Sequence, residues 1–451
     1  MGMARNPFYH RGPIRTLSAF YNRQQETEQI ASLLRVSQSV SIVGPRRIGK
    51  TSLLFHLQAP EVRHAHGLLP PEYIFVSINS EAMGQTTLSE AYALFLDALH
   101  DALSTSALEP GWKAGARPAD YRRLDSVLHS LSQRGTTVAF FIDEFELLAA
   151  NRNLDPAFFS GLRGLATRYA VSYVVASQHP LISLVYADNS VLSSPFFNVF
   201  VTLPLGVFEE DVAHGMLLAL LAGENLPEPA MRAVLDLAGP HPFFLQVAAY
   251  HAYELAHTGR PWDEQTTAQL CKVFEEEAQP HYLYSWHNLN EDERYALANL
   301  TLVQDDLGMR EALHQLQQQC LILPANSGYR YLSSSLQRFV RRQSVTDLIQ
   351  LGPFVIDLRH RVVTAGSDIL KLTRTQFDLL AYLAQQSGQT VPNRNLEAYI
   401  WHDEYVEDPE RLKAAIKHLR RALGPWGDCI VNERGVGYAL RVPAKAPYNG
   451  V

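Results

Sequence analysis

The first two hundred residues alternate between short apolar runs and stretches with helical periodicity. Four runs rich in β-branched and aromatic residues predict buried strands, at residues 40–43, 73–78, 137–142 and 171–176. Between them, apolar residues recur at helical spacing, most clearly at 88–104. Because helices separate successive strands, the pattern predicts an α/β domain with a parallel, doubly wound sheet.

From about residue 209 the pattern becomes helical. Helices are predicted at 212–221, 229–237, 243–257 and 264–277. Residues 291–343 then predict three helices and a hairpin that turns at 326–328, which is the order of a winged helix. These helices show no basic face, so we interpret this unit as a packing domain and not as a DNA reader.

The last hundred residues predict a second winged helix. Its expected strands lie at 354–357, 362–363 and 370–372, its helices at 375–386, 393–401 and 409–423, and its closing hairpin at 429–440. In the third helix Leu412, Ile416, Leu419 and Leu423 share one stripe, which we expect to face the domain core.

The other side of that third helix is basic. Lys and Arg outnumber carboxylates five to one over residues 409–423. A solvated basic face is the alternative interpretation, but a small Ala among the cations and the predicted wing favour a helix that enters the major groove of DNA. The predicted DNA contacts are Arg411, Lys413, Ala414, Lys417, His418, Arg420 and Arg421, with Arg434 in the hairpin.

The loop after the first predicted strand carries the strongest chemical signal. Residues 44–51 match G-x-x-x-x-G-K-[ST] between a strand and the start of a helix. Successive backbone N–H groups and a helix N-terminus favour phosphate. We expect Lys50 to reach the β- and γ-phosphates and the Thr51 hydroxyl to bind Mg²⁺. The predicted nucleotide contacts from this loop are Gly44, Pro45, Arg46, Arg47, Ile48, Gly49, Lys50, Thr51 and Ser52.

The strand at 137–142 ends in Asp143-Glu144, the Walker B pattern. A carboxylate at the end of a parallel strand lies beside the phosphates, so Asp143 is expected at Mg²⁺ with Thr51, and Glu144 is expected to polarise a water. The predicted catalytic residues are therefore Lys50, Asp143 and Glu144. An acidic pair that merely ends a strand is the alternative.

The fourth predicted strand leads to Ser177 and Gln178. A polar residue at this strand end can sense the γ-phosphate. An ordinary hydrogen bond that closes the strand fits the sequence equally well, and both interpretations stay open.

Composition limits the partners and the compartment. The 451 residues carry a net charge of −7, so any surface for nucleic acid must be local. Three distant cysteines favour a reducing cytosol over a disulfide framework. No apolar stretch approaches the length of a membrane span, and the first residues lack a signal peptide, so we expect a cytoplasmic protein without membrane partners.

Residues 6 to about 343 resemble the prokaryotic branch of the STAND class of AAA+-related P-loop ATPases. The resemblance rests on six segments: 6–8 (Asn-Pro-Phe), 20–23, 44–52, 142–146, 194–198 and 239–246. It implies that Pro242 packs against adenine and that the segment around Arg23 lines the nucleotide. It also implies a switch with slow turnover, in which ADP holds a closed monomer and ATP releases self-association.

Residues 351–442 resemble the OmpR/PhoB-type DNA-binding domain of response regulators. The matching segments are 372–380, 393–396, 419–423 and 435–438. The resemblance implies a four-stranded amino-terminal sheet, recognition of double-stranded DNA by the third helix, and a loop at about 402–408 that can touch RNA polymerase.

Together these patterns predict four domains: a P-loop ATPase domain (1–205), a helical domain (206–285), a winged-helix packing domain (286–345) and a winged-helix DNA-binding domain (350–445). The leading hypothesis is a transcription regulator switched by ATP and ADP with Mg²⁺, in which slow hydrolysis controls self-association on direct repeats. The alternatives are a STAND-type ATPase in defence or stress signalling, and a DNA-loading ATPase of the initiator or transposition type.

Overall fold

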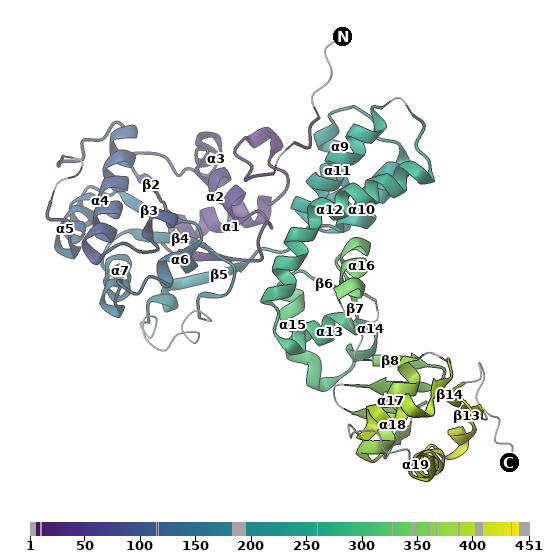
Figure 1. The fold of residues 1–451 in the computed structure, drawn as a ribbon. Helices are drawn as coiled ribbons and strands as arrows, with labels where there is room; N and C mark the ends of the chain where they lie inside the picture. The colour runs from purple at the N-terminus through teal and green to yellow at the C-terminus, as the bar shows by residue number, and fades with distance from the viewer. Residues whose placement is uncertain are drawn as a thin grey trace. The chain divides into compact units, whose positions relative to one another are not determined.

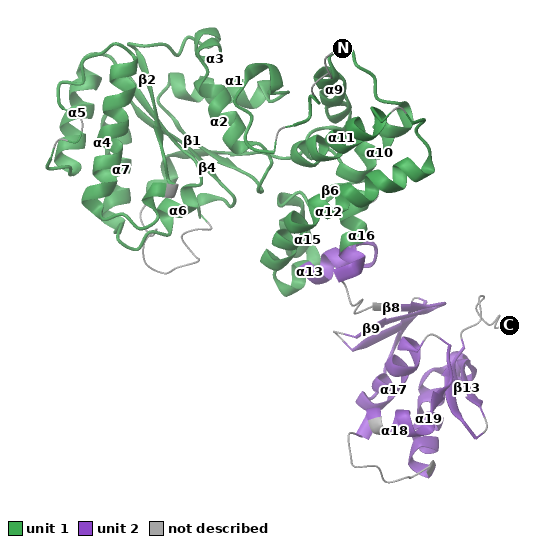
Figure 2. Cartoon of the chain, turned by 45° about the horizontal axis from the view of Figure 1, so that its top comes forward, with its two compact units in different colours: residues 1–293, 306–339 green, residues 294–305, 340–451 purple. Residues whose placement is uncertain are grey.

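The computed structural model describes residues 6–9, 11–113, 115, 117–182, 195–258, 260–326, 328–343, 348–358, 361–366, 368–386, 388–401, 409–433 and 435–441. The chain forms two compact units, coloured separately in Figure 2. Unit 1 comprises residues 1–293 and 306–339, and unit 2 comprises residues 294–305 and 340–451. Each unit is described on its own.

A five-stranded parallel sheet lies at the centre of the first part of unit 1 (Figure 1). Its order is β2-β3-β4-β1-β5, with β1 (Ser39–Val43), β2 (Tyr73–Ile78), β3 (Thr137–Ile142), β4 (Val171–Ser177) and β5 (Phe200–Pro204). The predicted parallel sheet is confirmed, and β5 is an addition. Val43 pairs with Ser177 and Pro204, so the carboxyl ends of the three neighbouring strands meet at one edge.

Alternating side chains of the sheet pack into two separate layers. Phe140 and Tyr173 face one layer, formed with α4 (Leu88–Thr105), α5 (Tyr121–Gln133) and α7 (Pro156–Arg168). Phe141 and Val174 face the other, formed with α1 (Gln24–Arg35) and α2 (Lys50–Gln58). In the part of the chain that the structure describes, this domain also contains two short helices, α3 (Pro60–Ala65) and α6 (Phe145–Ala149). Helices on both faces bury the sheet, which explains its continuous apolar strands.

Four helices follow: α9 (Glu210–Leu221), α10 (Glu228–Ala238), α11 (Pro242–Ala256) and α12 (Glu264–Asn288). The first three agree with prediction, but the expected end of the fourth at 277 was wrong. Helix α12 continues through Pro280 because residues beyond it still pack: Tyr282 is 3% exposed. Proline removes one hydrogen bond of the helix, and burial beyond it compensates.

The elements that follow are α13 (Glu291–Ala298), α14 (Leu300–Val303), α15 (Arg310–Gln318), the hairpin β6 (Ile322–Pro324) and β7 (Tyr329–Tyr331), and α16 (Ser334–Gln343). Short 3₁₀ helices occur at Leu17–Ala19, Glu81–Met83, Pro195–Val199, Leu307–Met309 and Gly424–Cys429. The chain passes between the two units inside α13 after Glu293, again after Asp305, and inside α16 after Phe339.

The carboxyl-terminal domain begins with an antiparallel sheet in the order β11-β10-β9-β8. These strands are β8 (Leu348–Leu351), β9 (Phe354–Asp357), β10 (Val362–Ala365) and β11 (Asp368–Leu370), so the implied four-stranded sheet is confirmed. Then come α17 (Arg374–Gln385), β12 (Val391–Pro392), α18 (Asn393–Trp401), α19 (Pro409–Ala422), β13 (Ile430–Glu433) and β14 (Gly437–Leu440). Strand β14 pairs with both β12 and β13.

The core stripe predicted for α19 is confirmed. Its four leucine and isoleucine side chains are at most 1% exposed, and they pack with α17 and the closing hairpin. Gly437 allows β14 to approach β12, because a Cβ there would lie 1.8 Å from the Val391 carbonyl oxygen. Among the described residues, no helix is long and apolar enough to cross a membrane.

Candidate nucleotide site and nucleic-acid interface

The loop between β1 and α2 has the shape that phosphate binding requires. Gly49 caps α2 with φ +108°, a conformation that other residues rarely adopt. Gly44 lies against β5, since an added Cβ would come within 2.4 Å of the Leu205 carbonyl oxygen. The nine-residue helix α2 then begins at Lys50, so its N-terminal N–H groups close the loop.

The two predicted magnesium ligands meet although 92 positions separate them in the sequence. The Thr51 hydroxyl donates to Oδ2 of Asp143 at 2.6 Å, and the backbone N–H of Glu144 donates to Oδ1 at 3.0 Å. A hydroxyl and a carboxylate oxygen are ligands that Mg²⁺ accepts. The Thr51 hydroxyl and the Asp143 carboxylate therefore fit Mg²⁺ and would hold it.

Lys50 lies inside the loop. Its ammonium donates to the carbonyl oxygens of Gly44 at 2.6 Å and Pro45 at 2.9 Å. Burial lowers the pKa of Lys50, and the nearby carboxylates, led by Glu146, offset only part of that effect. Phosphate oxygens would offer the same ammonium anionic acceptors in place of neutral ones.

A cavity of about 370 Å³ extends from this loop. One part of its lining comes from the loop, the start of α2, α6 and the adjacent strand ends: Arg46, Arg47, Gly49, Lys50, Thr51, Ser52, Asp143, Glu144, Glu146 and Gln178. The rest of the lining, apolar and aromatic for the most part, includes Ile14, Phe20, Tyr21, Phe208, Met216, Pro242 and Phe243, together with Arg23, Ile48 and Gln246. Of the predicted nucleotide contacts, Gly44 and Pro45 are absent from this lining.

Several lining residues could not be found from sequence motifs. Phe208 and Met216 come from the segment after β5 and from α9, and neither belongs to a recognisable pattern. Glu146 follows the Walker B pair by two positions and lies in the matched segment 142–146, but no motif assigned it a role. Arg23, which the resemblance assigned to the nucleotide, is 7% exposed and donates to Glu26 at 2.9 Å and to the Gly206 carbonyl.

Both arginines of the loop reach other elements of unit 1. The Arg46 guanidinium lies 4.4 Å from the ring centre of Tyr284 on α12, and that of Arg47 lies 5.0 Å from the ring centre of Phe243 on α11. Arg47 also donates to the Arg11 carbonyl at 2.7 Å. The phosphate loop is thus in direct contact with the helical domain and the amino-terminal segment.

The two candidate sensors at the end of β4 both bind protein groups. Ser177 donates to the His179 carbonyl at 2.8 Å. Gln178 donates to Oε1 of Glu146 at 3.0 Å and accepts from the Tyr284 hydroxyl at 3.4 Å. Gln178 therefore connects a carboxylate of the cavity with helix α12.

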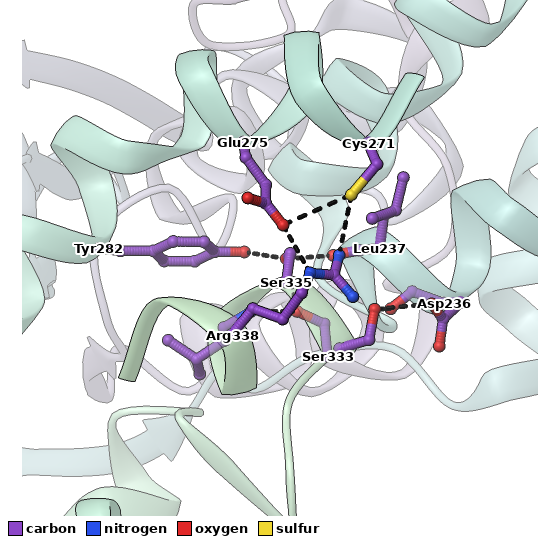
Figure 3. Close-up of polar contacts among 10 residues, drawn as sticks. Asp236, Leu237, Cys271, Glu275, Tyr282, Ser333, Ser335 and Arg338 are labelled. Atoms are coloured by element: carbon purple, nitrogen blue, oxygen red, sulfur yellow. Dashed lines mark hydrogen bonds and ion pairs between the residues drawn. The ribbon is translucent and has the colours of Figure 1, made fainter. Parts of the chain in front are cut away.

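Helix α12 also binds α16 through a polar cluster, and α16 in turn binds α10 (Figure 3). Arg338 donates to Oε1 of Glu275 at 2.6 Å and to Cys271 Sγ at 3.2 Å. Tyr282 hydrogen-bonds with Ser335 at 2.8 Å, and Ser335 donates to the Leu237 carbonyl at 2.6 Å. Burial raises the pKa of Tyr282 to about 12, so its hydroxyl stays protonated. Helix α12 thus contacts both the nucleotide loop and α16.

The exposed face of α19 carries most of the predicted DNA contacts: Arg411, Lys413, Ala414, Lys417, His418 and Arg421. Arg420 differs, because its Nε donates to the Ile430 carbonyl at 3.1 Å and its side chain is partly buried. The structure thus directs Arg420 towards β13. Arg434 and the loop 402–408 lie outside the described residues.

Sequence comparison decides the family of unit 1. The family described as "Novel STAND NTPase 2" matches residues 27–304, which include the loop and both strand ends described above. The chain belongs to this STAND NTPase family. Membership in a P-loop NTPase family implies nucleotide binding. A second family, "Transcriptional regulatory protein, C terminal", matches residues 366–440, so the carboxyl-terminal domain of this STAND NTPase is an OmpR/PhoB-type winged-helix DNA-binding domain.

Individual relatives resemble parts of the STAND NTPase. The transcriptional regulatory protein AfsQ1 of Streptomyces coelicolor is 28% identical over 149 residues, 32% of this chain and 65% of that protein. The sensory transduction protein RegX3 of Mycobacterium tuberculosis is 32% identical over 96 residues, 21% of this chain and 42% of that protein. The chain spans about half the length of such curated relatives.

Among solved structures, the Walker-type ATPase PABY2304 of Pyrococcus abyssi resembles the fold with a TM-score of 0.50. It is 15% identical, and the alignment covers 74% of this chain and 99% of that one. At this identity the likeness concerns the fold alone.

Proposed function

We propose that this STAND NTPase is a transcription regulator whose DNA binding is switched by ATP and ADP. The observation that carries the proposal is the hydrogen bond between Thr51 and Asp143 at the phosphate loop. The same loop contacts α12 through Arg46 and Tyr284. Helix α12 in turn contacts α16, one of the helices in which the chain passes from one compact unit to the other. A change at the phosphates therefore has a continuous path of contacts inside unit 1 to the start of the DNA-binding unit.

In this proposal the loop N–H groups and Lys50 hold the phosphates, while Thr51 and Asp143 hold Mg²⁺. The ion would neutralise phosphate charge. Glu144 orients the attacking water. We propose slow hydrolysis, because Glu144 is exposed to solvent and Gln178 is engaged by Glu146 and Tyr284. Because the phosphates occupy the loop, the base of the nucleotide packs against Pro242 and the apolar lining residues of the cavity.

On the DNA side, α19 enters the major groove. Neutralising about five phosphates gives a salt slope of only about −4.5, so one domain alone would bind weakly. Self-association in the ATP form would place two domains on direct repeats and raise affinity through effective concentration. Contact with RNA polymerase through residues 402–408 is part of the same proposal.

The first experiment measures the nucleotide that the purified chain retains and its mass in ADP and in ATP. We expect bound ADP, a monomer in ADP and a larger species in ATP. Lys50→Ala should abolish nucleotide binding, whereas the exposed Lys113→Ala should not. Unchanged ATP affinity in Lys50→Ala would refute the phosphate-loop assignment, and an unchanged mass in both nucleotides would refute the switch.

Footprinting on promoter DNA with and without ATP separates this proposal from the alternatives. A regulator should protect a defined site more strongly with ATP. Rapid hydrolysis stimulated by DNA, without a defined site, would favour a DNA-loading ATPase instead.

A further inference from the structure

The apolar part of the nucleotide cavity contains one polar side chain with an unused hydrogen-bonding atom. Phe20, Phe208, Met216 and Pro242 provide apolar lining suited to a flat ring. Gln246 lies one helical turn after Pro242 on α11 and also lines the cavity. Because residues four apart share a helix face, both side chains lie on the same side of α11.

Gln246 is held in place by its surroundings. It is 6% exposed, and its neighbours Leu245 and Val247 are completely buried. Among the described residues, no donor reaches its buried Oε1 atom. A buried acceptor without a donor destabilises a fold, so a ligand in the cavity that supplies a donor once the amide turns towards it would be bound favourably.

We propose that Gln246 reads the edge of the base and makes the site selective for adenine over guanine. An amide presents an acceptor and a donor side by side, which matches the N6 amino group and N7 of adenine. Guanine presents two acceptors, O6 and N7, at the same positions, so one end of the amide would face a group that it cannot bind. This inference rests on the proposed nucleotide binding and names the side chain that selects the base.

The test compares ATP and GTP binding to the full chain by titration calorimetry with Mg²⁺. The variant is Gln246→Met, which keeps the length of the side chain without its amide. The control is Gln269→Met on α12, where the side chain is exposed. We expect the unmodified chain and the control to prefer ATP by about 10- to 100-fold. In Gln246→Met the ratio should approach one, mainly through weaker ATP binding.

A melting curve without nucleotide distinguishes base reading from a structural role. Gln246→Met removes the buried atom that lacks a partner, so its melting temperature should equal or exceed that of the unmodified chain. An unchanged ATP-to-GTP ratio in Gln246→Met, or equal losses for both nucleotides, would overturn the inference and leave nucleotide binding intact. If the unmodified chain binds neither nucleotide, the proposed function fails, and this inference fails with it.

Discussion

Residues other than glycine adopt left-handed backbone conformations around the nucleotide cavity. Arg23, Arg47 and Glu144 have φ angles of 71°, 65° and 45° and all line it. This region costs free energy for a residue with a Cβ, and it persists where the surrounding structure fixes it. At Glu144 the conformation turns the chain directly from β3 into α6. We infer that the fold fixes the backbone at this position.

The buried His241 should make the free energy of unfolding depend on pH. Burial, together with His281 and Arg23, lowers the pKa of His241 to about 3, from an ordinary value of 6.5. Between pH 6.5 and about pH 3 the unfolded chain therefore binds more protons than the folded chain. The contribution of the neutral His241 to stability is lost as the pH falls through that window. From pH 7 to pH 5 this group should remove about 2 kcal/mol of unfolding free energy.

Urea unfolding of the full chain at pH 7, 6 and 5 measures the effect. His241→Asn cannot titrate in this range, so the difference in stability between the two proteins should change by about that amount. Parallel pH profiles for both proteins would contradict the neutral, buried state of this histidine.

At the scale of elements, α19 places the side chains of two adjacent arginines in different environments. Arg421 is exposed, whereas Arg420 binds the Ile430 carbonyl. Arg421→Ala should weaken binding at the preferred site by about 1–3 kcal/mol if the side chain reads a base. Arg420→Ala should instead lower the unfolding free energy by about 1–3 kcal/mol, since it leaves a buried carbonyl without its donor.

Competition binding on matched and scrambled DNA, with unfolding curves for both variants, tests this pair. Equal losses on all sequences would make Arg421 a phosphate contact. A loss of DNA affinity in Arg420→Ala without a loss of stability would return Arg420 to the DNA face.

The contact between α12 and Gln178 allows a variant that should uncouple self-association from the bound nucleotide. Tyr284→Phe removes the hydroxyl that binds Gln178 but keeps the ring beside Arg46. One such hydrogen bond is worth about 0.5–1.5 kcal/mol, so the fraction of self-associated protein in ADP should rise by about two- to tenfold. Tyr282→Phe, two positions away, loses its bond to Ser335 and should lower stability instead. Sedimentation in ADP measures the first effect, and an unchanged monomer fraction would exclude Tyr284 from the coupling.

At the scale of the whole molecule, the salt dependence of DNA binding counts the domains engaged. With about five phosphates per domain, the slope should be about −4.5 in ADP and about −9 in ATP if two subunits bind together. Titrations of a two-site DNA from low to high salt, with Lys50→Ala as the control, test this. Identical slopes in both nucleotides would mean that the domains act independently of nucleotide state.

The sequence determined the features that depend on local pattern and spacing. Strands β1 to β4, the phosphate loop, the acidic strand end and the apolar stripe of α19 follow from periodicity and motifs, because each is encoded by consecutive or regularly spaced residues. The family resemblances added the four-stranded sheet of unit 2.

Only the tertiary structure decided the features that depend on distant partners. Strand β5 pairs with β1 across more than 150 positions, and α12 continues past Pro280 because packing outweighs local preference. The same reason governs individual side chains. Arg420 and Arg421 are chemically identical neighbours, yet the carbonyl of Ile430 engages only Arg420. The role we propose for Gln246 depends on folding, which places it in the cavity without a partner for its Oε1 among the described residues.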